Sequence, residues 1–287
     1  MAVQRALESA RPRSSRLFCD AFAQRFVSRR WRLVLRASRV GVVRRAVEVL
    51  YDWVAGPGPR ASAVARTRLI DDLVTDALSA GSIGQLVILG AGFDSRAWRL
   101  PGLEKVTVFE VDHPATQQVK RQAFGGIVGP PAWQVRFVPV DFERDDLGQA
   151  LGAAGYRDGV PSLFVWEGVT NYLTPPAVDQ TLGAVRDLAA PGSLLVFTDV
   201  DRAVLAGDDA RFPEARRWVE GVRRRGEPWR FGLDPAEVAE FLARRGFGLI
   251  GDVSTANAGE RYFGPLGRRD QGSALYHVVT ASVLAPA

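Results

Sequence analysis

Short apolar runs alternate with helical patterns through the middle of the chain. Each run has six to eight residues, and together they occupy 85–90, 106–112, 135–141, 162–168 and 193–200. Apolar residues at helical spacing fill three of the intervals, at 114–124, 145–155 and 175–189. Strands buried on both faces and separated by helices indicate a parallel, doubly wound sheet in an α/β fold. In such a sheet, ligands bind beyond the carboxyl ends of the strands.

The pattern changes after residue 230. It predicts a helix over 234–247, with Asp234 as its N-cap and Pro235 in its first turn, followed by strands at 248–254 and 274–284. We expect these two strands to be antiparallel neighbours, because a polar stretch rather than a helix joins them. A parallel core with an antiparallel ending differs from the symmetrical fold that binds dinucleotides.

The first 60 residues form a separate region. Arginines alternate with large apolar residues over 22–54, which predicts amphipathic helices that each pack one face. Glycines and prolines at 55–62 separate this region from a helix predicted over 63–78. We therefore expect a helical cap or lid at 1–60, which forms one structural unit with a larger domain at 61–287. An insertion at about 202–232 would complete the cap.

Composition narrows the class of protein. The 287 residues are 47% hydrophobic and 24% charged, which is typical of a soluble globular protein. No uncharged apolar stretch reaches the length of about 18 residues that a transmembrane helix needs, and arginines interrupt any secretory signal. We expect a cytoplasmic protein without stable membrane insertion. Cys19 is the only cysteine, which excludes an intrachain disulfide and a cysteine metal cluster, and no metal is expected.

The net charge of +5 is unevenly distributed. Residues 1–69 contain fifteen arginines against four acidic residues. Three interpretations are solvated helix faces, a cap that attracts an anionic or lipophilic substrate, and a surface for nucleic acid or membrane. The alternation with apolar residues favours the first, and no nucleic-acid partner is expected.

The loop after the first strand, VILGAGFDSRAWRL (87–100), restricts the choice of nucleotide. Gly90 and Gly92 allow a tight turn and let backbone N–H groups approach a ligand. Ser95 stands where a dinucleotide fingerprint has its third glycine, and Asp94 before it would repel a pyrophosphate. Asp94 instead suits a cofactor end with a positive charge. A turn with only a structural role is the alternative.

The next strand ends supply further candidates. Asp112 follows the glycines by about 20 residues, where a carboxylate accepts hydrogen bonds from an adenosine ribose, although it could instead cap a helix. Asp141 and Phe142 could hold and cover an adenine, or be a loop aspartate beside a core phenylalanine. Glu167 directly follows an apolar strand and needs a cationic partner if it is buried, such as an ammonium or sulfonium group.

Several of these stretches together resemble the leucine carboxyl methyltransferase family. They are VILGAGFDSRAWRL, FEVDHPATQQVKR, VDFERDDLGQAL and WEGVTNYLTP, supported by ARTRLIDDLV and GEPWRFGLDPAEVAEFLARRGF. The similarity is closest to the bacterial S-adenosylmethionine-dependent O-methyltransferases of the polyketide-tailoring and actinobacterial type. It implies a class I methyltransferase fold, in which a Rossmann-like sheet has seven strands with the last antiparallel. Residues 61–287 would then bind S-adenosyl-L-methionine.

The resemblance also assigns roles to individual residues. The cofactor would be held by Arg66 at its methionine carboxylate, Gly90 and Gly92 beneath its methionine part, Asp112 at the ribose, Asp141 and Phe142 at the adenine, and Glu167 near its amino end. Asn171 and Tyr172, about a turn beyond Glu167, could face the methyl acceptor. Asn171 stands where an apolar residue is more usual, which concerns the substrate rather than the cofactor.

The expected reaction is O-methylation of a small-molecule acceptor. A carboxylate acceptor is ionised near neutral pH and needs no general base, whereas a hydroxyl does. Neither His113 nor His277 is placed as a base, which favours the carboxylate of a polyketide-like or lipophilic metabolite. The alternatives are an NAD-dependent oxidoreductase and a cofactor-binding protein without catalysis. A homo-oligomer is compatible with all three.

Overall fold

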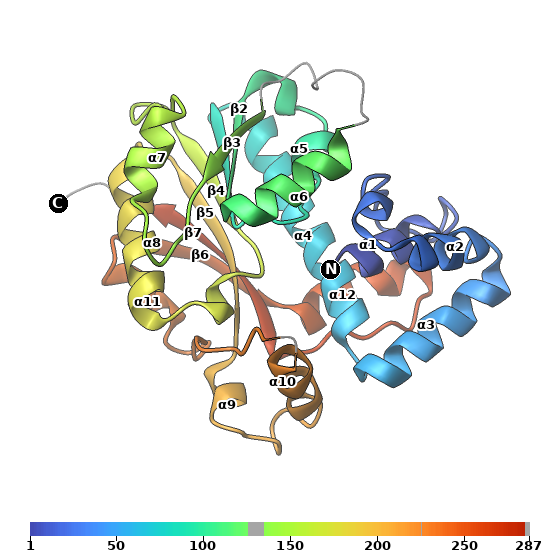
Figure 1. Ribbon diagram of the computed structural model, residues 1–287. Helices are drawn as coiled ribbons and strands as arrows, with labels where there is room; N and C mark the ends of the chain where they lie inside the picture. Colours follow the sequence, from blue (N-terminus) through green and yellow to red (C-terminus); the bar gives the residue numbers. More distant parts are fainter. Residues whose placement is uncertain (126–134, 225, 285–287) are drawn as a thin grey trace.

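The computed structural model describes residues 1–125, 135–224 and 226–284. Within these ranges, seven strands form one sheet in the order β3-β2-β1-β4-β5-β7-β6 (Figure 1). The strands are β1 (Gln85–Leu89), β2 (Thr107–Asp112), β3 (Val135–Pro139), β4 (Ser162–Trp166), β5 (Leu194–Val200), β6 (Phe247–Ser254) and β7 (Tyr276–Val283). Strands β1 to β5 pair in parallel, and β7 is antiparallel to both neighbours. The predicted α/β fold, with its antiparallel last strand, is confirmed.

Helices cover both faces of the sheet. The first face packs against α4 (Pro59–Ser79) and α12 (Thr255–Phe263), and the second against α7 (Leu147–Ala153), α8 (Pro175–Leu188) and α11 (Val238–Ala243). Alternation along β1 sends Leu86 and Ile88 to the first face and Val87 and Leu89 to the second. All four side chains are buried, which explains why this strand is a continuous apolar run.

Two helices begin close to strand ends and have the caps that their sequences favour. Helix α6 (Pro114–Phe124) starts after β2, and Nδ1 of His113 accepts a hydrogen bond from the backbone N of Ala115 at 3.2 Å. Helix α8 starts after β4, and Oγ1 of Thr174 accepts one from the backbone N of Ala177 at 3.4 Å. Proline occupies the first turn of both helices, where its missing N–H costs no hydrogen bond.

Two expectations for the C-terminal part need correction. The helix predicted over 234–247 is the shorter α11, because Oδ1 of Asp234 accepts a hydrogen bond from the backbone N of Ala236 and forms a turn instead of a cap. Helix α12 lies between β6 and β7, although the polar sequence TANAGERYF does not predict it. The antiparallel pairing of β6 with β7 is confirmed despite this helix.

The N-terminal region forms a group of helices beside the sheet, at the right of Figure 1. It consists of α1 (Ala2–Ser9), the short 3-10 helix η1 (Ala23–Phe26), α2 (Arg29–Ala37) and α3 (Gly41–Ala55). Leu7 of α1 and Leu35 of α2 belong to a small apolar cluster of their own. In α3, however, no residue is fully buried. The prediction that each amphipathic helix packs its apolar face is therefore wrong for α3.

The segment predicted as an insertion contains α9 (Arg202–Leu205) and α10 (Ala215–Arg223). Nε1 of Trp218 in α10 donates a hydrogen bond to the carbonyl of Pro57 at 3.2 Å, so this segment contacts the end of the N-terminal helical group. Short helical turns complete the described elements, namely α5 (Arg96–Arg99), η2 (Leu103–Lys105), η3 (Thr170–Tyr172) and η4 (Gly264–Leu266). Across the described ranges, no helix is both long and apolar enough to cross a membrane.

Candidate functional site

The carboxyl ends of β1, β2 and β4 meet at one edge of the sheet. Gly90 and Gly92 follow β1, Asp112 ends β2, and Glu167 follows β4. The parallel register of β1 with β2 and with β4 puts these residues close together. This is the edge at which doubly wound sheets bind ligands.

Both glycines of the β1 loop adopt positive φ. Gly90 has a φ of 64°, and a Cβ there would lie 2.3 Å from Cγ2 of Val169, so any side chain would collide. Gly92 has a φ of 41°, and a Cβ would meet Oδ2 of Asp112 at an ordinary 3.9 Å. Glycine is therefore required by space and conformation at Gly90, and by conformation alone at Gly92.

Asp112 joins the β1 loop to the end of β2. Its Oδ2 accepts a hydrogen bond from the backbone N of Gly92 at 2.6 Å, and its Oδ1 accepts one from the backbone N of His113 at 2.8 Å. Burial raises the pKa of Asp112, although these two N–H groups oppose the rise. Each carboxylate oxygen keeps a further lone pair for a ligand hydroxyl. The side chain that caps α6 is His113, so Asp112 does not serve as that cap.

A buried arginine that our sequence analysis did not single out, Arg96 of α5, lies at the centre of this edge. Its Nε is 2.8 Å from Oδ1 of Asp71, and its Nη1 is 2.5 Å from both Oδ2 of Asp94 and Oε2 of Glu167. Burial would lower the pKa of Arg96, but the three carboxylates outweigh it and raise that pKa well above its usual value. We call Arg66, Asp71, Asp94, Arg96 and Glu167 the strand-end cluster.

Glu167 has the cationic partners that its position demands. Besides Arg96, its carboxylate meets Arg66 of α4, with 2.9 Å between Nε of Arg66 and Oε1 of Glu167. Burial opposes ionisation, but the two guanidinium groups outweigh it and hold the pKa of Glu167 far below its usual range. The protein itself thus supplies cations that the sequence analysis expected from a ligand.

Asp94 is also paired within the protein. Its Oδ1 accepts a hydrogen bond from the backbone N of Arg96 at 2.7 Å, in addition to the contact of Oδ2 with the guanidinium. Burial would raise the pKa of Asp94, yet Arg96 lowers it, so the carboxylate is ionised. A direct role toward a cofactor stays a prediction for this residue.

Arg66 connects the cluster to the last strand and to the candidate acceptor residues. Its guanidinium carbon lies 4.5 Å from the ring centroid of Tyr276, and its Nη2 is 3.0 Å from Sδ of Met1. The hydroxyl of Tyr276 donates to Oδ1 of Asn171 at 3.3 Å. Asn171 is fully buried, and its carbonyl accepts a hydrogen bond from the backbone N of Arg230 at 2.7 Å.

Three candidates lie in more accessible positions. Asp141 and Phe142 are half-buried just beyond β3, where the neighbouring Val140 donates its backbone N–H to the carbonyl of Asp112 at 3.0 Å. Tyr172 is half-buried at the end of η3. The structure thus places Asp141 and Phe142 next to Asp112, and Tyr172 next to Asn171. Their assigned roles stay predictions.

The N-terminal helix packs directly on the β1 loop. Nη2 of Arg5 in α1 donates to the carbonyl of Phe93, and its Nε is 3.0 Å from Oδ2 of Asp20. The same oxygen of Asp20 accepts a hydrogen bond from Oγ of Ser95 at 2.7 Å. Through these contacts the first helix is tied to the loop that contains Gly90 and Gly92.

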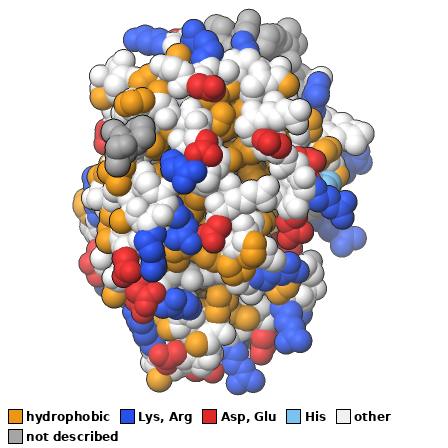
Figure 2. All heavy atoms as spheres, turned by 90° about the vertical axis from the view of Figure 1, so that its left-hand side faces the viewer, with side chains coloured by type: hydrophobic (Ala, Val, Ile, Leu, Met, Phe, Trp, Pro, Cys, Tyr) orange, Lys and Arg blue, Asp and Glu red, His pale blue; other side chains and the backbone are white. Residues whose placement is uncertain are grey.

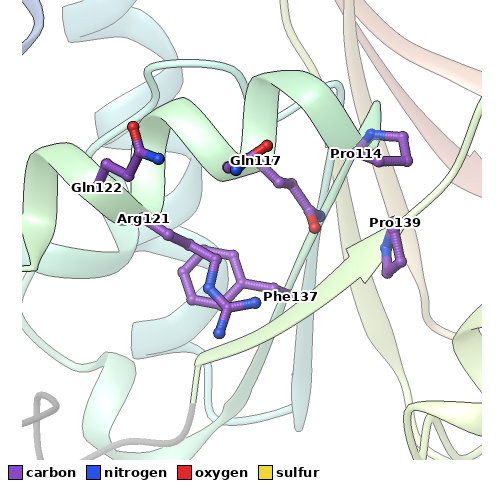
Figure 3. A pocket seen from close by; sticks show the side chains of 7 residues that line it. Pro114, Gln117, Arg121, Gln122, Phe137 and Pro139 are labelled. Carbon is purple, nitrogen blue, oxygen red and sulfur yellow. The ribbon is translucent and has the colours of Figure 1, made fainter.

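A separate hollow of about 490 Å³ lies between α6 and β3. Figure 3 shows the side chains that line it. The side-chain amide of Gln117 donates to the carbonyls of Glu110 and Val138, so it is already engaged. The guanidinium of Arg121 lies over the ring of Phe137, with 5.2 Å between its carbon and the ring centroid. Neither the β1 loop nor the strand-end cluster lines this hollow, and we do not place a cofactor in it.

Arg96, Asp71 and Tyr276 are the contributions that sequence reasoning missed. Arg96 stands two residues after Asp94, and Asp71 lies in the stretch ARTRLIDDLV beside Arg66. Each position is ordinary by local pattern, and Arg96 is one of many arginines. The acidic Glu167 after a buried strand signals that a buried cation lies somewhere in the chain, but it identifies neither Arg96 nor Asp71 and Tyr276.

Two solved structures have a similar fold. A methyltransferase from Thermobifida fusca, titled "putative", superposes with a TM-score of 0.59 at 21% identity, over 85% of this chain and 89% of that one. A protein from Streptomyces avermitilis, described as a member of the duf574 family, gives a TM-score of 0.54 at 17% identity, over 98% and 96% of the two chains. The fold is therefore that of a class I methyltransferase, as predicted.

The chain belongs to the leucine carboxyl methyltransferase family, whose model matches residues 1–186. The family that the sequence motifs predicted is confirmed. The predicted cofactor is S-adenosyl-L-methionine, and the curated relatives are named as methyltransferases that depend on it.

Those relatives are mycobacterial. A protein of Mycobacterium sp. strain JLS, named "Putative S-adenosyl-L-methionine-dependent methyltransferase", is 37% identical over 201 residues, which are 67% of this chain and 63% of that protein. A protein of Mycobacterium tuberculosis strain H37Rv with the same description is 36% identical over 203 residues, with the same shares. The matched region thus spans just under two thirds of the curated relatives' length.

Proposed function

We propose that this protein transfers a methyl group from S-adenosyl-L-methionine to an oxygen atom of a small-molecule acceptor. The observation that supports this most is the pairing of Arg66 with Glu167 at 2.9 Å, beside Gly90 and Gly92. The amino-acid end of the cofactor has one carboxylate and one ammonium group. A guanidinium next to a carboxylate presents the complementary pair of charges.

The remaining residues at this edge suit the rest of the cofactor. Asp112 faces the β1 loop with acceptor capacity to spare, which suits the ribose hydroxyls. Asp141 and Phe142, next to Asp112, would hold and cover the adenine. The chain offers no third glycine for a pyrophosphate, and Asp94 holds a negative charge there, so an NAD-dependent oxidoreductase is not favoured.

Catalysis would depend mainly on alignment. When bound, the cofactor would supply an electrophilic methyl group on a sulfonium. Transfer of that methyl group to the acceptor oxygen would leave the sulfur, with the bonding electrons, as a neutral thioether. Asn171 and Tyr172 would orient that oxygen. Tyr276 contacts both Asn171 and Arg66, so it would link the position of the acceptor to that of the cofactor. Holding the two reactants in line supplies much of the rate acceleration. A carboxylate acceptor needs no base, and no histidine contacts the strand-end cluster among the described residues.

The acceptor that we propose is lipophilic, such as a polyketide-like acid. The N-terminal helices and the segment 202–232 would form a cap over its pocket. Trp229 of this segment lies with its ring centroid 6.3 Å from that of Tyr276, which places an aromatic side chain near Asn171. Trp218 attaches the segment to the N-terminal group. Aromatic side chains at such positions bind apolar ligands through a large contact area.

Calorimetric titration tests the cofactor assignment. We expect the product, S-adenosylhomocysteine, to bind and NADH not to bind. Asp112→Asn removes a charge-assisted acceptor, worth about 1.5–3 kcal/mol, and should weaken binding of S-adenosylhomocysteine roughly tenfold or more. Asp187→Asn, an exposed change on α8, is the matched control and should leave the affinity unchanged. Equal affinity of the Asp112 variant and the parent protein would contradict the proposed ribose site.

Incubation with methyl-labelled cofactor tests the activity. A panel of lipophilic carboxylic acids, phenols and cell extracts is offered as acceptors, and labelled products are separated by chromatography. Label in a base-labile ester indicates a carboxylate acceptor, and label in a base-stable ether indicates a hydroxyl. Tight binding of S-adenosylhomocysteine without any labelled product would instead support a binding protein without catalysis.

A further inference from the structure

Helix α3 is oriented with its polar side toward the protein. Nη2 of Arg11 is 2.6 Å from Oε1 of Glu48, and Nη2 of Arg60 is 2.7 Å from Oδ2 of Asp52. One turn away, the hydroxyl of Tyr51 accepts a hydrogen bond from Nε2 of Gln4. These contacts anchor α3 by ion pairs and hydrogen bonds, and they fix which of its sides faces solvent.

The solvent-facing side of α3 is apolar. Val42 is 82% exposed, Trp53 73%, Val54 69%, Val49 62% and Leu50 60%. Positions 42, 46, 49, 50, 53 and 54 follow helical spacing, so these side chains form one stripe along the helix. Contiguous exposed apolar surface of this kind marks an interaction site.

Exposed arginines lie on α3 and on its neighbour α2. Helix α2 packs beside α3, and exposed arginines in α2, in the turn after it and in α3 are Arg29, Arg30, Arg32, Arg36, Arg39 and Arg45. In the described part of the chain, no acidic side chain forms an ion pair with any of these six. Leu33, which is 64% exposed, lies among them. We call these arginines together with Leu33 and the α3 stripe the hairpin surface.

The opposite side of the molecule has a different surface. Figure 2 shows the face covered by α7, α8 and α11, where positive, negative and apolar side chains are interspersed. There Arg186 pairs with Asp187, Arg245 with Asp179 and Arg244 with Glu240. These three arginines have acidic partners, which the six arginines of the hairpin surface lack within the described residues.

We propose that the hairpin surface docks this protein reversibly on an anionic lipid bilayer. A helix with an apolar face, an adjacent row of arginines and an exposed tryptophan is suited to lie in the plane of a membrane interface. Trp53, Leu50 and Val54 would enter the acyl boundary, and the arginines would contact lipid phosphates. At 15 residues, α3 is too short to span the bilayer and lies on it instead.

Two other occupants fit the surface less well. In a twofold dimer the same patch meets itself, so unpaired arginines would face unpaired arginines. A nucleic acid would engage the arginines but leave the apolar stripe of α3 without a partner. An anionic bilayer is complementary to both parts of the surface at once.

Vesicle flotation tests the proposal with the full-length protein. We expect it to float with vesicles of phosphatidylcholine containing phosphatidylglycerol, and not with phosphatidylcholine alone, with binding that weakens at high salt. The double variant Leu50→Ser, Trp53→Ser should lose roughly tenfold or more in partitioning, because each buried apolar side chain contributes strongly. Arg36→Gln with Arg39→Gln should reduce partitioning several-fold, since each arginine adds attraction to the anionic surface.

Controls separate docking from misfolding and from other partners. Ile250→Ser changes a side chain of similar exposure, 59%, on β6 and should leave partitioning unchanged. Every variant is checked for the parent's S-adenosylhomocysteine affinity and melting temperature. In the parent protein, lipids brominated in their acyl chains should quench a component of the tryptophan fluorescence, and Trp53→Phe should lack this component. This measurement needs no destabilised variant.

Several outcomes would overturn the proposal. They are equal binding to neutral and anionic vesicles, full binding by the Leu50/Trp53 variant, and brominated-lipid quenching that does not depend on Trp53. A dimer in sedimentation velocity that the same double substitution dissociates would assign the surface to a second copy. Retardation of an oligonucleotide, abolished by the arginine substitutions and unaffected by Leu50→Ser, would assign it to nucleic acid.

Discussion

The strand-end cluster and the hairpin surface use the same residue type in opposite ways. In the cluster, Arg96 is 1% exposed and meets three carboxylates, and Arg66 is paired with Glu167. On the hairpin surface, arginines such as Arg36 and Arg39 are exposed and form no ion pair within the described residues. Each arginine that is buried in the described ranges meets at least one carboxylate, because an unpaired charge in the interior is costly.

The apolar residues of the two regions also differ in exposure. Around the cluster, apolar side chains such as Val165 and Ile88 are fully buried, whereas Trp53 and Leu50 of the hairpin point to solvent. The cluster is thus an internal network of paired charges enclosed by apolar side chains. Among the described residues, the arginines of the hairpin surface have no acidic partner, and its apolar side chains are exposed. This difference is the reason that we propose an external partner for the hairpin surface.

The substitution Arg96→Met should have the largest effect. It leaves Asp71, Asp94 and Glu167 buried around an apolar side chain, and breaking a buried ion network in this way costs about 3–5 kcal/mol. We expect the urea midpoint to fall accordingly and binding of S-adenosylhomocysteine to be lost. Arg96→Lys, which keeps one charge, should recover part of the stability. Arg36→Met is the matched control on the hairpin, and a loss of similar size there would break the comparison.

Asp199 shows what happens to a buried acid without a guanidinium partner. Burial raises its pKa to about 8, with Asp252 and Asp201 adding to the rise and His277 opposing it. The folded state therefore holds a proton that the unfolded chain releases near pH 4, and stability falls as pH rises from there through 8. Linkage gives a loss of about 2 kcal/mol between pH 6 and pH 8.

Thermal unfolding at several pH values measures this effect. Asp199→Asn should flatten the decline, and the part that remains comes from His277, whose raised pKa acts in the same direction. Glu167 and Asp94 have lowered pKa values, so their stabilisation is fully present above the ordinary carboxyl pKa and is lost progressively as pH falls below it. If the Asp199 variant loses as much stability as the parent protein when pH rises, the raised pKa of Asp199 is contradicted.

Arg66→Gln tests whether the cluster serves the cofactor. The amide keeps a donor near Glu167 but removes the charge that we propose for the methionine carboxylate, and a charged hydrogen bond contributes about 1.5–3 kcal/mol. We expect roughly tenfold weaker binding of S-adenosylhomocysteine by calorimetry. Adenosine, which lacks the amino-acid end, should bind the parent and the variant equally. Equal weakening for both ligands would indicate a general structural defect.

The strand ends were predictable from sequence because local pattern determines them. An apolar run that stops at Gly90, Asp112 or Glu167 identifies the end of a buried strand without any tertiary information. The partner of Glu167 was not predictable, because the choice of Arg66 and Arg96 among many arginines depends on how α4 and α5 pack. The sequence predicts that a buried carboxylate needs a cation, but not which one.

The orientation of α3 shows a second limit. Periodicity identifies which residues share a face of a helix, but it does not determine whether that face points inward. Here the ion pairs of Glu48 with Arg11 and of Asp52 with Arg60 orient the helix, and both partners lie outside α3. Packing of the apolar face is the default expectation for a monomer. In α3 the apolar face does not pack against the protein, and this is the basis for proposing an interaction surface there.

The smallest effect is expected from the exposed side of the hairpin. Leu50→Ser should change the free energy of unfolding by no more than about 0.5 kcal/mol, because an exposed side chain loses little on truncation. Leu35→Ala, on the inner face of α2 where the side chain is 2% exposed, should cost about 2–5 kcal/mol. Urea unfolding of the two variants measures both changes in the free energy of unfolding, provided that its dependence on urea concentration is the same in the two variants. A large loss for Leu50→Ser in the isolated protein would mean that α3 packs its apolar face in solution. In that case the contrast between the paired interior cluster and the exposed outer surface would not hold.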